Sequence, residues 1–117
     1  MTIEKNAYQG DDLPLLQSAL AGWIAEAGDC GYCHVGDVAH RLNNDLHSLP
    51  LSKRVTVWHR ALDQIIVGFA INLVFDNAFE AYVSPAFRGT SEEKLMLETA
   101  QNDTWVLIQE SGIKDET

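Results

Sequence analysis

The sequence predicts an α+β fold, that is, a mixed α/β domain with a central, mostly antiparallel sheet of about five strands flanked by three helices. Two observations predict it. The spacing of apolar residues is helical over residues 12–46 and changes to the alternation typical of strands over residues 54–83. A helix-start signal near residue 90 then adds a third helix. At 117 residues, the chain suffices for one domain with a single core.

The chain is expected to open with a strand and a helix. Residues 2–8 can form a short strand, which ends at Gly10. Asp11 as a cap, with Pro14 in the first turn, is typical of a helix start. Apolar residues then recur at helical spacing up to Ala27, so we expect a long first helix with a broad apolar face.

A second helix is predicted to follow a short loop. Gly36-Asp37 is typical of a helix cap. The apolar face of this helix would consist of Val38, Ala39, Leu42 and Leu46. Residues 47–53 contain Pro50 and are expected to be a connection.

Three strands are predicted in the middle of the chain. Residues 54–60 alternate and are rich in β-branched and aromatic side chains. Residues 65–74 are a near-continuous apolar run, which suits a central strand covered on both faces. Asp76-Asn77 is typical of a hairpin turn, and residues 78–83 would return antiparallel.

The last part of the chain is expected to contain a helix and a final strand. Thr90 with Glu93 three residues later has the pattern of a capping box, which predicts a helix to about Gln101. Residues 105–108 (Trp-Val-Leu-Ile) predict a short strand. Its free edge would pair with another copy of the chain, so we expect a dimer. The domain would span residues 1–110, before a polar tail at 111–117.

The composition argues against several functional classes. The formal net charge is −9, from 17 acidic and 8 basic residues. Such a surface repels phosphate backbones, so nucleic acid is not an expected partner. No apolar run is long enough to cross a bilayer, and the polar start does not resemble a signal peptide, so we expect no membrane partner and a cytoplasmic location.

The order of elements and several local strings resemble the GCN5-related N-acetyltransferase (GNAT) superfamily. The strings are Val57-Trp58, Ile66-Val67-Gly68-Phe69-Ala70 and Tyr82-Val83-Ser84-Pro85-Ala86-Phe87-Arg88-Gly89. The third string is similar to the end of the family's fourth strand, which introduces the acetyl-CoA loop. Residues 32–38, followed by Arg41-Leu42, are similar to the N-terminal halves of tandem GNAT proteins. In a complete domain, one more helix and further strands would follow Gln109, so the chain is expected to be incomplete at its C-terminus.

The resemblance implies acetyl-CoA as cofactor and a small amine as acceptor. It assigns cofactor binding to Val83, Arg88, Gly89 and Thr90. Glu80 is a weak candidate for the general base, because the family often keeps one on this strand and a carboxylate of raised pKa can deprotonate an amine. The competing interpretation is that Glu80 only lies on the solvated face of a half-covered strand.

The loop after this strand departs from the family pattern. That pattern is Gln or Arg, two residues, Gly, one residue, then Gly or Ala. With Arg88 at the first position, Ser91 and Glu93 replace the two small residues. Glycines let the backbone approach a phosphate, and the helix N-terminus attracts it. Two carboxylates, Glu92 and Glu93, would instead repel a polyanion, so we expect acetyl-CoA to bind weakly or not at all.

Two functions therefore remain open. The chain is either the non-catalytic half of a tandem N-acetyltransferase, a pseudoenzyme that supports a C-terminal catalytic GNAT domain, or an active small-amine N-acetyltransferase completed by a homodimer mate. The altered loop and the missing C-terminal elements favour the first.

The cysteines and histidines have alternative interpretations. Cys30-Gly31-Tyr32-Cys33-His34 matches the haem-attachment pattern, and the cysteine pair could be a redox pair. The favoured interpretation is two partly buried side chains in a loop. The spacing of His34, His40 and His47 is not the i, i+4 spacing of helical metal ligands, and His59 falls in a strand, so no metal is expected.

Overall fold

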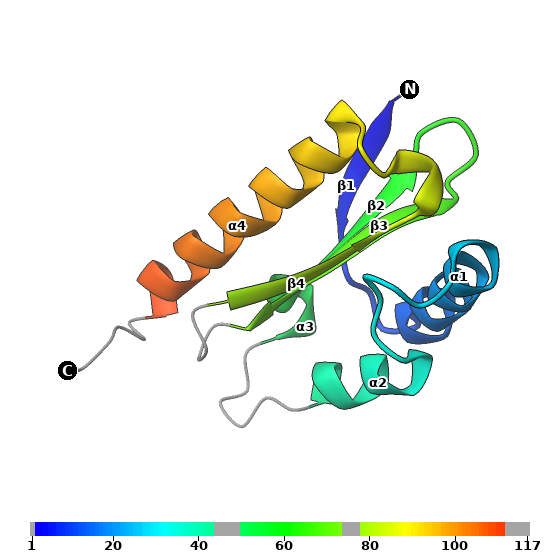
Figure 1. The fold of residues 1–117 in the computed structure, drawn as a ribbon. Helices are drawn as coiled ribbons and strands as arrows, with labels where there is room; N and C mark the ends of the chain where they lie inside the picture. The colour runs from blue at the N-terminus through cyan, green and yellow to red at the C-terminus, as the bar shows by residue number, and fades with distance from the viewer. Residues whose placement is uncertain (1, 44–49, 74–77, 112–117) are drawn as a thin grey trace.

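The computed structural model describes residues 2–43, 50–73 and 78–111 (Figure 1). In chain order the elements are β1 (Ile3–Ala7), α1 (Asp12–Ala27), α2 (Val35–Asn43), α3 (Leu51–Arg54), β2 (Val55–Arg60), β3 (Ile66–Leu73), β4 (Ala78–Val83), the 3-10 helix η2 (Pro85–Phe87) and α4 (Ser91–Ser111). The strands form one antiparallel sheet in the order β1-β2-β3-β4. The predicted α+β class is confirmed.

The helices lie in two layers on either side of the sheet. Figure 1 shows α1 and α2 against one face and α4 across the other. Each layer has its own apolar cluster. The α1/α2 cluster includes Leu16, Leu20, Trp23, Val38, Val57, Phe69 and Ile71, and the α4 cluster includes Trp58, Val67, Ala70, Val83, Phe87, Met96 and Ala100.

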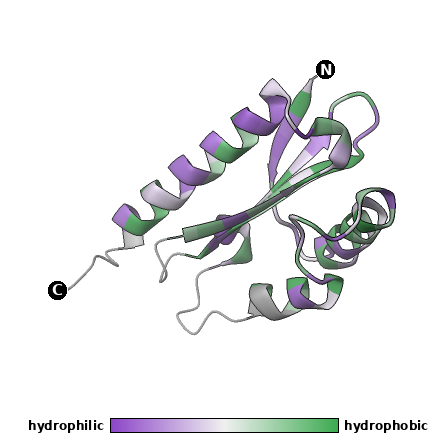
Figure 2. Ribbon diagram, in the orientation of Figure 1, coloured by the Kyte–Doolittle hydropathy of each residue, from purple (hydrophilic) through white to green (hydrophobic). Residues whose placement is uncertain are grey.

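The central strand β3 is buried on both faces, as its apolar run predicts. All of its residues from Val67 to Asn72 are buried. Gly68 lets α4 approach closely, because a Cβ at this position would lie 2.8 Å from Sδ of Met96. Along α4, hydrophilic and hydrophobic residues alternate, as expected for a helix with one buried face (Figure 2).

The predicted strand at residues 105–108 is wrong, because these residues continue α4. The reason is a helical period that runs through the whole segment. Met96, Ala100, Thr104 and Ile108 follow at intervals of four and are all buried. No Gly or Pro interrupts this series. The described sheet therefore has four strands and not about five, and its free edges belong to β1 and β4.

Smaller differences concern the helix boundaries. Asp11 caps α1 without a side-chain hydrogen bond, and the carboxylate of Asp12 accepts the N–H of Gln9 instead. The expected connection at residues 47–53 ends in the helical turn α3, so the described residues form four α-helices and not three. Leu46 and the predicted turn Asp76-Asn77 lie outside the described residues, as does the tail after Ser111.

Among the described residues, no helix is both long and apolar enough to cross a membrane.

Candidate functional site

The candidate site lies where β4 ends and α4 begins, the position of the expected acetyl-CoA loop. After η2, the backbone turns at Gly89, whose φ of +77° is a conformation that favours glycine. The C=O of Phe87 accepts the N–H of Thr90 at 3.2 Å and also the Thr90 hydroxyl. These bonds fix the direction in which α4 leaves the sheet.

Thr90 and Glu93 cap the first turn of α4, as the sequence pattern predicts. Oγ1 of Thr90 accepts the N–H of Glu93 at 3.2 Å. The carboxylate of Glu93 turns back and accepts the N–H of Gly89 at 2.8 Å. In a standard capping box the Glu93 carboxylate would accept the N–H of Thr90, but here the C=O of Phe87 already accepts that N–H. The Gly89 amide, a predicted cofactor contact, is thus bonded to a protein carboxylate.

Arg88 points towards the loop between α1 and α2. Its Nη2 donates to the C=O of Cys30 at 2.9 Å, and its guanidinium carbon lies 4.5 Å from the centre of the Tyr32 ring. This contact combines a hydrogen bond with a cation–π interaction. The positive group that the sequence assigns to the cofactor is therefore engaged by the protein itself.

Tyr32 occupies the end of β4. Its hydroxyl donates to the C=O of Val83 at 2.6 Å. The N–H of Ser84 bonds back to β3, so the backbone groups of Val83, which alternate with those of Ser84, point to the free side of the strand. Tyr32 thus covers the predicted cofactor contact at Val83. Burial is the main cause that raises the pKa of Tyr32, whereas the Arg88 charge lowers it.

Glu80 is bonded to its neighbour on the same face of β4. The hydroxyl of Tyr82 donates to Oε1 of Glu80 at 2.6 Å. Burial raises the pKa of Tyr82 well above its usual value, and the hydrogen bond to Glu80 adds to the shift, as does Cys33. The candidate base is therefore an acceptor for a tyrosine that stays protonated.

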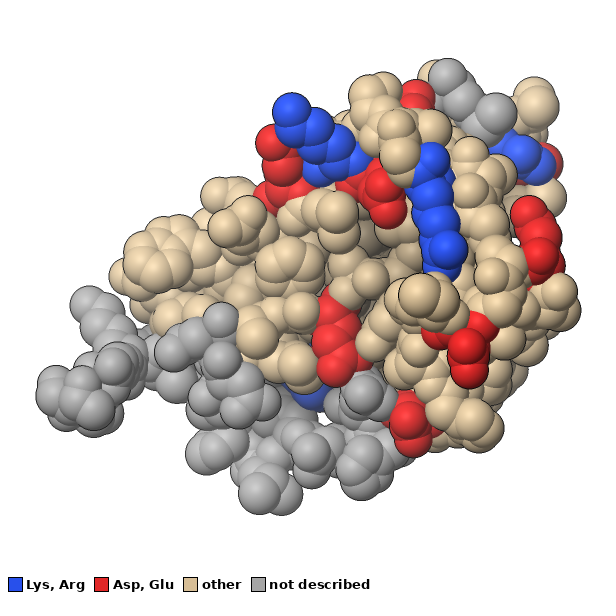
Figure 3. Space-filling model, viewed as in Figure 1, with Lys and Arg blue, Asp and Glu red and all other residues tan. Residues whose placement is uncertain are grey.

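Charged side chains gather around the start of α4, whereas few lie over β4 and the C-terminal half of this helix (Figure 3). A hydrogen bond from its own backbone N–H is the main cause that lowers the pKa of the Glu92 carboxyl, so Glu92 is ionised at neutral pH. A negative charge at a helix N-terminus is stabilised by the helix dipole. The same charge opposes a second anion at this position.

The other sequence candidates are dispersed. Cys30 and Cys33 are both free thiols, the first exposed and the second half-buried. Nδ1 of His34 accepts the N–H of Gly36 at 3.0 Å. Nδ1 of His59 lies 2.9 Å from Nδ2 of the Asn6 side chain. In the part of the chain that the structure describes, no three His, Cys, Asp or Glu side chains lie close enough to hold a metal ion. His47 lies outside that part.

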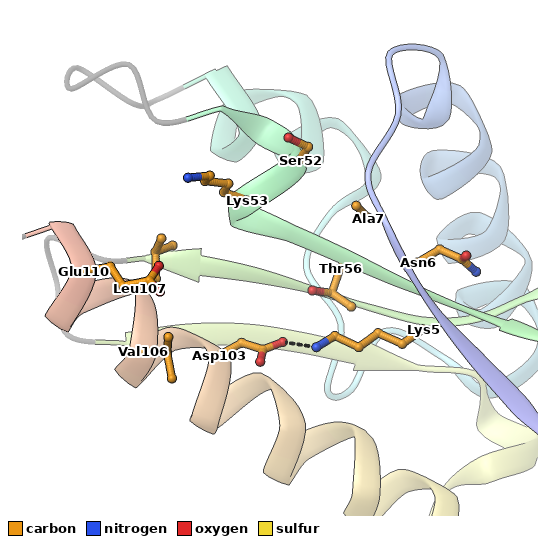
Figure 4. A pocket seen from close by; sticks show the side chains of 10 residues that line it. All are labelled: Lys5, Asn6, Ala7, Ser52, Lys53, Thr56, Asp103, Val106, Leu107 and Glu110. Atoms are coloured by element: carbon orange, nitrogen blue, oxygen red, sulfur yellow. Dashed lines mark ion pairs between the residues drawn. The ribbon is translucent and has the colours of Figure 1, made fainter.

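A pocket of about 350 Å³ opens between β1, β2 and the C-terminal half of α4 (Figure 4). Lys5 and Asp103 face one another across it, with 2.7 Å between Nζ and Oδ2. Lys53, Thr56 and Glu110 line the same pocket. Sequence reasoning missed it because residues 105–108 were assigned to a strand, which separated Asp103 from Glu110.

The fold defines the class of protein that this chain resembles. The structure is similar to the crystal structure of a GCN5-related N-acetyltransferase from Sphaerobacter thermophilus, with a TM-score of 0.62 and 18% sequence identity over 92% of this chain. The chain thus has a GNAT fold, as its sequence pattern predicts. It matches 33% of that relative, about a third of its length. No protein-family model and no curated protein sequence matches this chain.

Proposed function

We propose that this chain is a non-catalytic domain of GNAT fold, which supports a catalytic N-acetyltransferase domain. The observation that carries the proposal is the hydrogen bond from the Gly89 N–H to the Glu93 carboxylate. It occupies an amide that a cofactor diphosphate would need.

The residues around this amide do not fit a polyanionic cofactor. A helix N-terminus binds phosphate through free N–H groups and its dipole. Glu93 takes up the Gly89 amide, and Glu92 adds an ionised carboxylate in the same turn. Displacement of Glu93 by a diphosphate would leave its carboxylate without the Gly89 N–H and next to like charge.

Two further contacts support the same conclusion on the β4 side. The Tyr32 hydroxyl donates a hydrogen bond to the C=O of Val83. Arg88 donates to the C=O of Cys30 and lies over the Tyr32 ring. The family resemblance assigns four residues to acetyl-CoA. Three of them already have hydrogen-bond partners within the chain, namely Val83, Arg88 and Gly89. The fourth, Thr90, caps α4.

The partner that this proposal implies is a C-terminal catalytic GNAT domain. The match to a relative about three times as long as the matched region is consistent with a second domain. In such an assembly the present chain would contribute packing surface or shape the access of an amine substrate to its neighbour.

Calorimetric titration with acetyl-CoA tests the proposal. We expect a dissociation constant above about 1 mM. The standard free energy of binding would then be weaker than about −4 kcal/mol. The double substitution Ser91→Gly/Glu93→Ala restores the family's loop pattern and frees the Gly89 amide. We expect it to bind at least about tenfold more tightly than the unchanged chain. The control Glu110→Ala removes one exposed carboxylate near the other end of α4 and should change nothing. Micromolar binding by the unchanged chain would contradict the proposal.

A second function is an active N-acetyltransferase of a small amine, completed by a dimer mate. The observation that favours it is the carboxylate of Glu80 on β4, beside the protonated Tyr82. An active enzyme would release free thiol from acetyl-CoA in the presence of an amine panel, and Glu80→Gln would abolish that release. The support function predicts no thiol release above the protein-free rate.

A further inference from the structure

The loop between α1 and α2 carries two free thiols that differ in exposure. Cys30 is exposed, whereas Cys33 is half-buried. The sequence favours two partly buried side chains here, and this expectation fails for Cys30. The loop turns tightly: the N–H of Tyr32 bonds to the C=O of Asp29 at 3.0 Å, and Gly31 has a φ of +87°. A small reagent therefore has access to Cys30, and a second thiol follows three residues later.

Tyr32 lies between the two thiols in the chain and covers the end of β4. Its hydroxyl donates to the C=O of Val83 at 2.6 Å. The guanidinium of Arg88 lies over its ring and also donates to the C=O of Cys30. The thiols and the side chain that covers the end of β4 therefore belong to one segment of four residues.

We propose that Cys30 and Cys33 exchange with small disulfides, and that the disulfide they form weakens the contact between Tyr32 and Val83. In the dithiol form, the Cys33 thiol is hydrogen-bonded to the Tyr82 hydroxyl. Disulfide formation takes this thiol away from Tyr82 and requires the two cysteine Cα atoms to lie about 4.4–6.8 Å apart. The ring that closes contains the backbone of Tyr32, so it constrains where the tyrosine side chain can reach.

Glutathione disulfide is the chemical class of oxidant that balances the exchange. Cys30 loses its proton to solvent, and its sulfur attacks one sulfur of the reagent. The S–S bond of the reagent breaks, and one glutathione leaves as a thiolate that takes up a proton. Cys33 then loses its proton and attacks Sγ of Cys30, which breaks the mixed disulfide and releases the second glutathione. The protein gives up two protons and two electrons, and the reagent becomes two thiols.

The coupling between the thiols and Tyr32 is reciprocal, as thermodynamic linkage requires. A contact that is stronger in the dithiol form opposes oxidation, so removal of the Tyr32 hydroxyl should make the pair easier to oxidise. Oxidation in turn releases the C=O of Val83 from Tyr32. This inference is independent of the non-catalytic function, because it requires neither binding nor exclusion of acetyl-CoA.

Equilibration with mixtures of reduced and oxidised glutathione, followed by mass spectrometry, tests the exchange. The chain has two cysteines, and we expect both thiols to be lost together in a monomer that lacks two hydrogens. Cys33→Ser should instead stop at the mixed disulfide, with one glutathione on Cys30, because the second thiol is absent. Thiols that persist at every glutathione ratio, or disulfide-linked dimers as the sole oxidised product, would overturn the inference.

Tyr32→Phe tests the coupling to the end of β4. We expect this variant to remain folded by circular dichroism and to raise the equilibrium constant for oxidation at least about fivefold. Tyr8→Phe is the matched control, because it removes a hydroxyl from another tyrosine of the α1/α2 cluster outside the loop and should leave the constant unchanged. In the unchanged chain, oxidation should shift the amide resonance of Ser84, whose N–H shares a peptide group with the C=O of Val83. Equal oxidation constants for Tyr32→Phe and the unchanged chain would contradict the coupling.

Discussion

At the scale of single residues, Glu93 and Tyr32 occupy backbone groups at the end of β4. Each places a polar group on a backbone group that the family resemblance assigns to the cofactor: Glu93 on the Gly89 N–H and Tyr32 on the Val83 C=O. The sequence predicted that Thr90 and Glu93 cap α4, but not the first contact, because a capping box would use the Thr90 N–H and Glu93 accepts the Gly89 N–H instead. It could not predict the second, since Tyr32 lies 51 residues from Val83 and only the fold brings the two together.

The pH dependence of stability should report on Tyr82. Burial raises its pKa in the folded chain above the usual value of about 10. The folded state therefore keeps its proton where the unfolded state loses it. The associated stability is fully present below about pH 10 and is lost as the pH rises towards the folded pKa.

Ultraviolet titration of the phenolate can check this. We expect Tyr82 to ionise only on alkaline unfolding, and Tyr82→Phe to reduce the number of tyrosines that titrate in this late step by one. Complete titration of all tyrosines near pH 10 without unfolding would contradict the expectation.

At the scale of elements, α4 shows where local patterns mislead. Trp105, Val106, Leu107 and Ile108 have high strand propensity, but the interval-of-four series from Met96 to Ile108 buries one helical face against β3 and β4. The strands at 54–60, 65–74 and 78–83 were predicted to within about two residues, because their alternation or continuous apolar runs had no competing helical period. The assembly of residues into the pocket of Lys5 and Asp103 depends on α4 and could not be predicted.

A buried polar pair anchors the C-terminal half of α4. The hydroxyl of Thr104 donates to Oδ1 of Asn72 on β3, and the Asn72 amide donates to the C=O of Lys53 at 3.4 Å. Thr104→Val would leave the Asn72 oxygen buried without its donor, so we expect a loss of about 1–3 kcal/mol in the free energy of unfolding.

Denaturant unfolding measures this loss. Thr99→Val makes the same chemical change at a half-buried position of the same helix and should cost less than about 0.5 kcal/mol. Equal effects of the two substitutions would show that the bond to Asn72 does not stabilise α4.

At the scale of the whole molecule, the chain has a GNAT fold, and the backbone groups that the family resemblance assigns to the cofactor at Val83 and Gly89 are bonded to side chains of the chain itself. The sheet and its two helical layers match the Sphaerobacter thermophilus N-acetyltransferase over 92% of this chain. The order of elements made this fold predictable, since a strand, two helices and a three-strand meander precede the loop. The network of Arg88, Tyr32 and Val83 was not predictable, because it joins the α1–α2 loop to the end of β4.

The most direct test of this account is an amide NMR titration with acetyl-CoA that follows Gly89, Thr90 and Ser91. Because Glu93 holds the Gly89 N–H, we predict that these three resonances stay unchanged up to millimolar cofactor. Saturable shifts of the same resonances at micromolar acetyl-CoA would show a diphosphate at the start of α4 and would contradict the account.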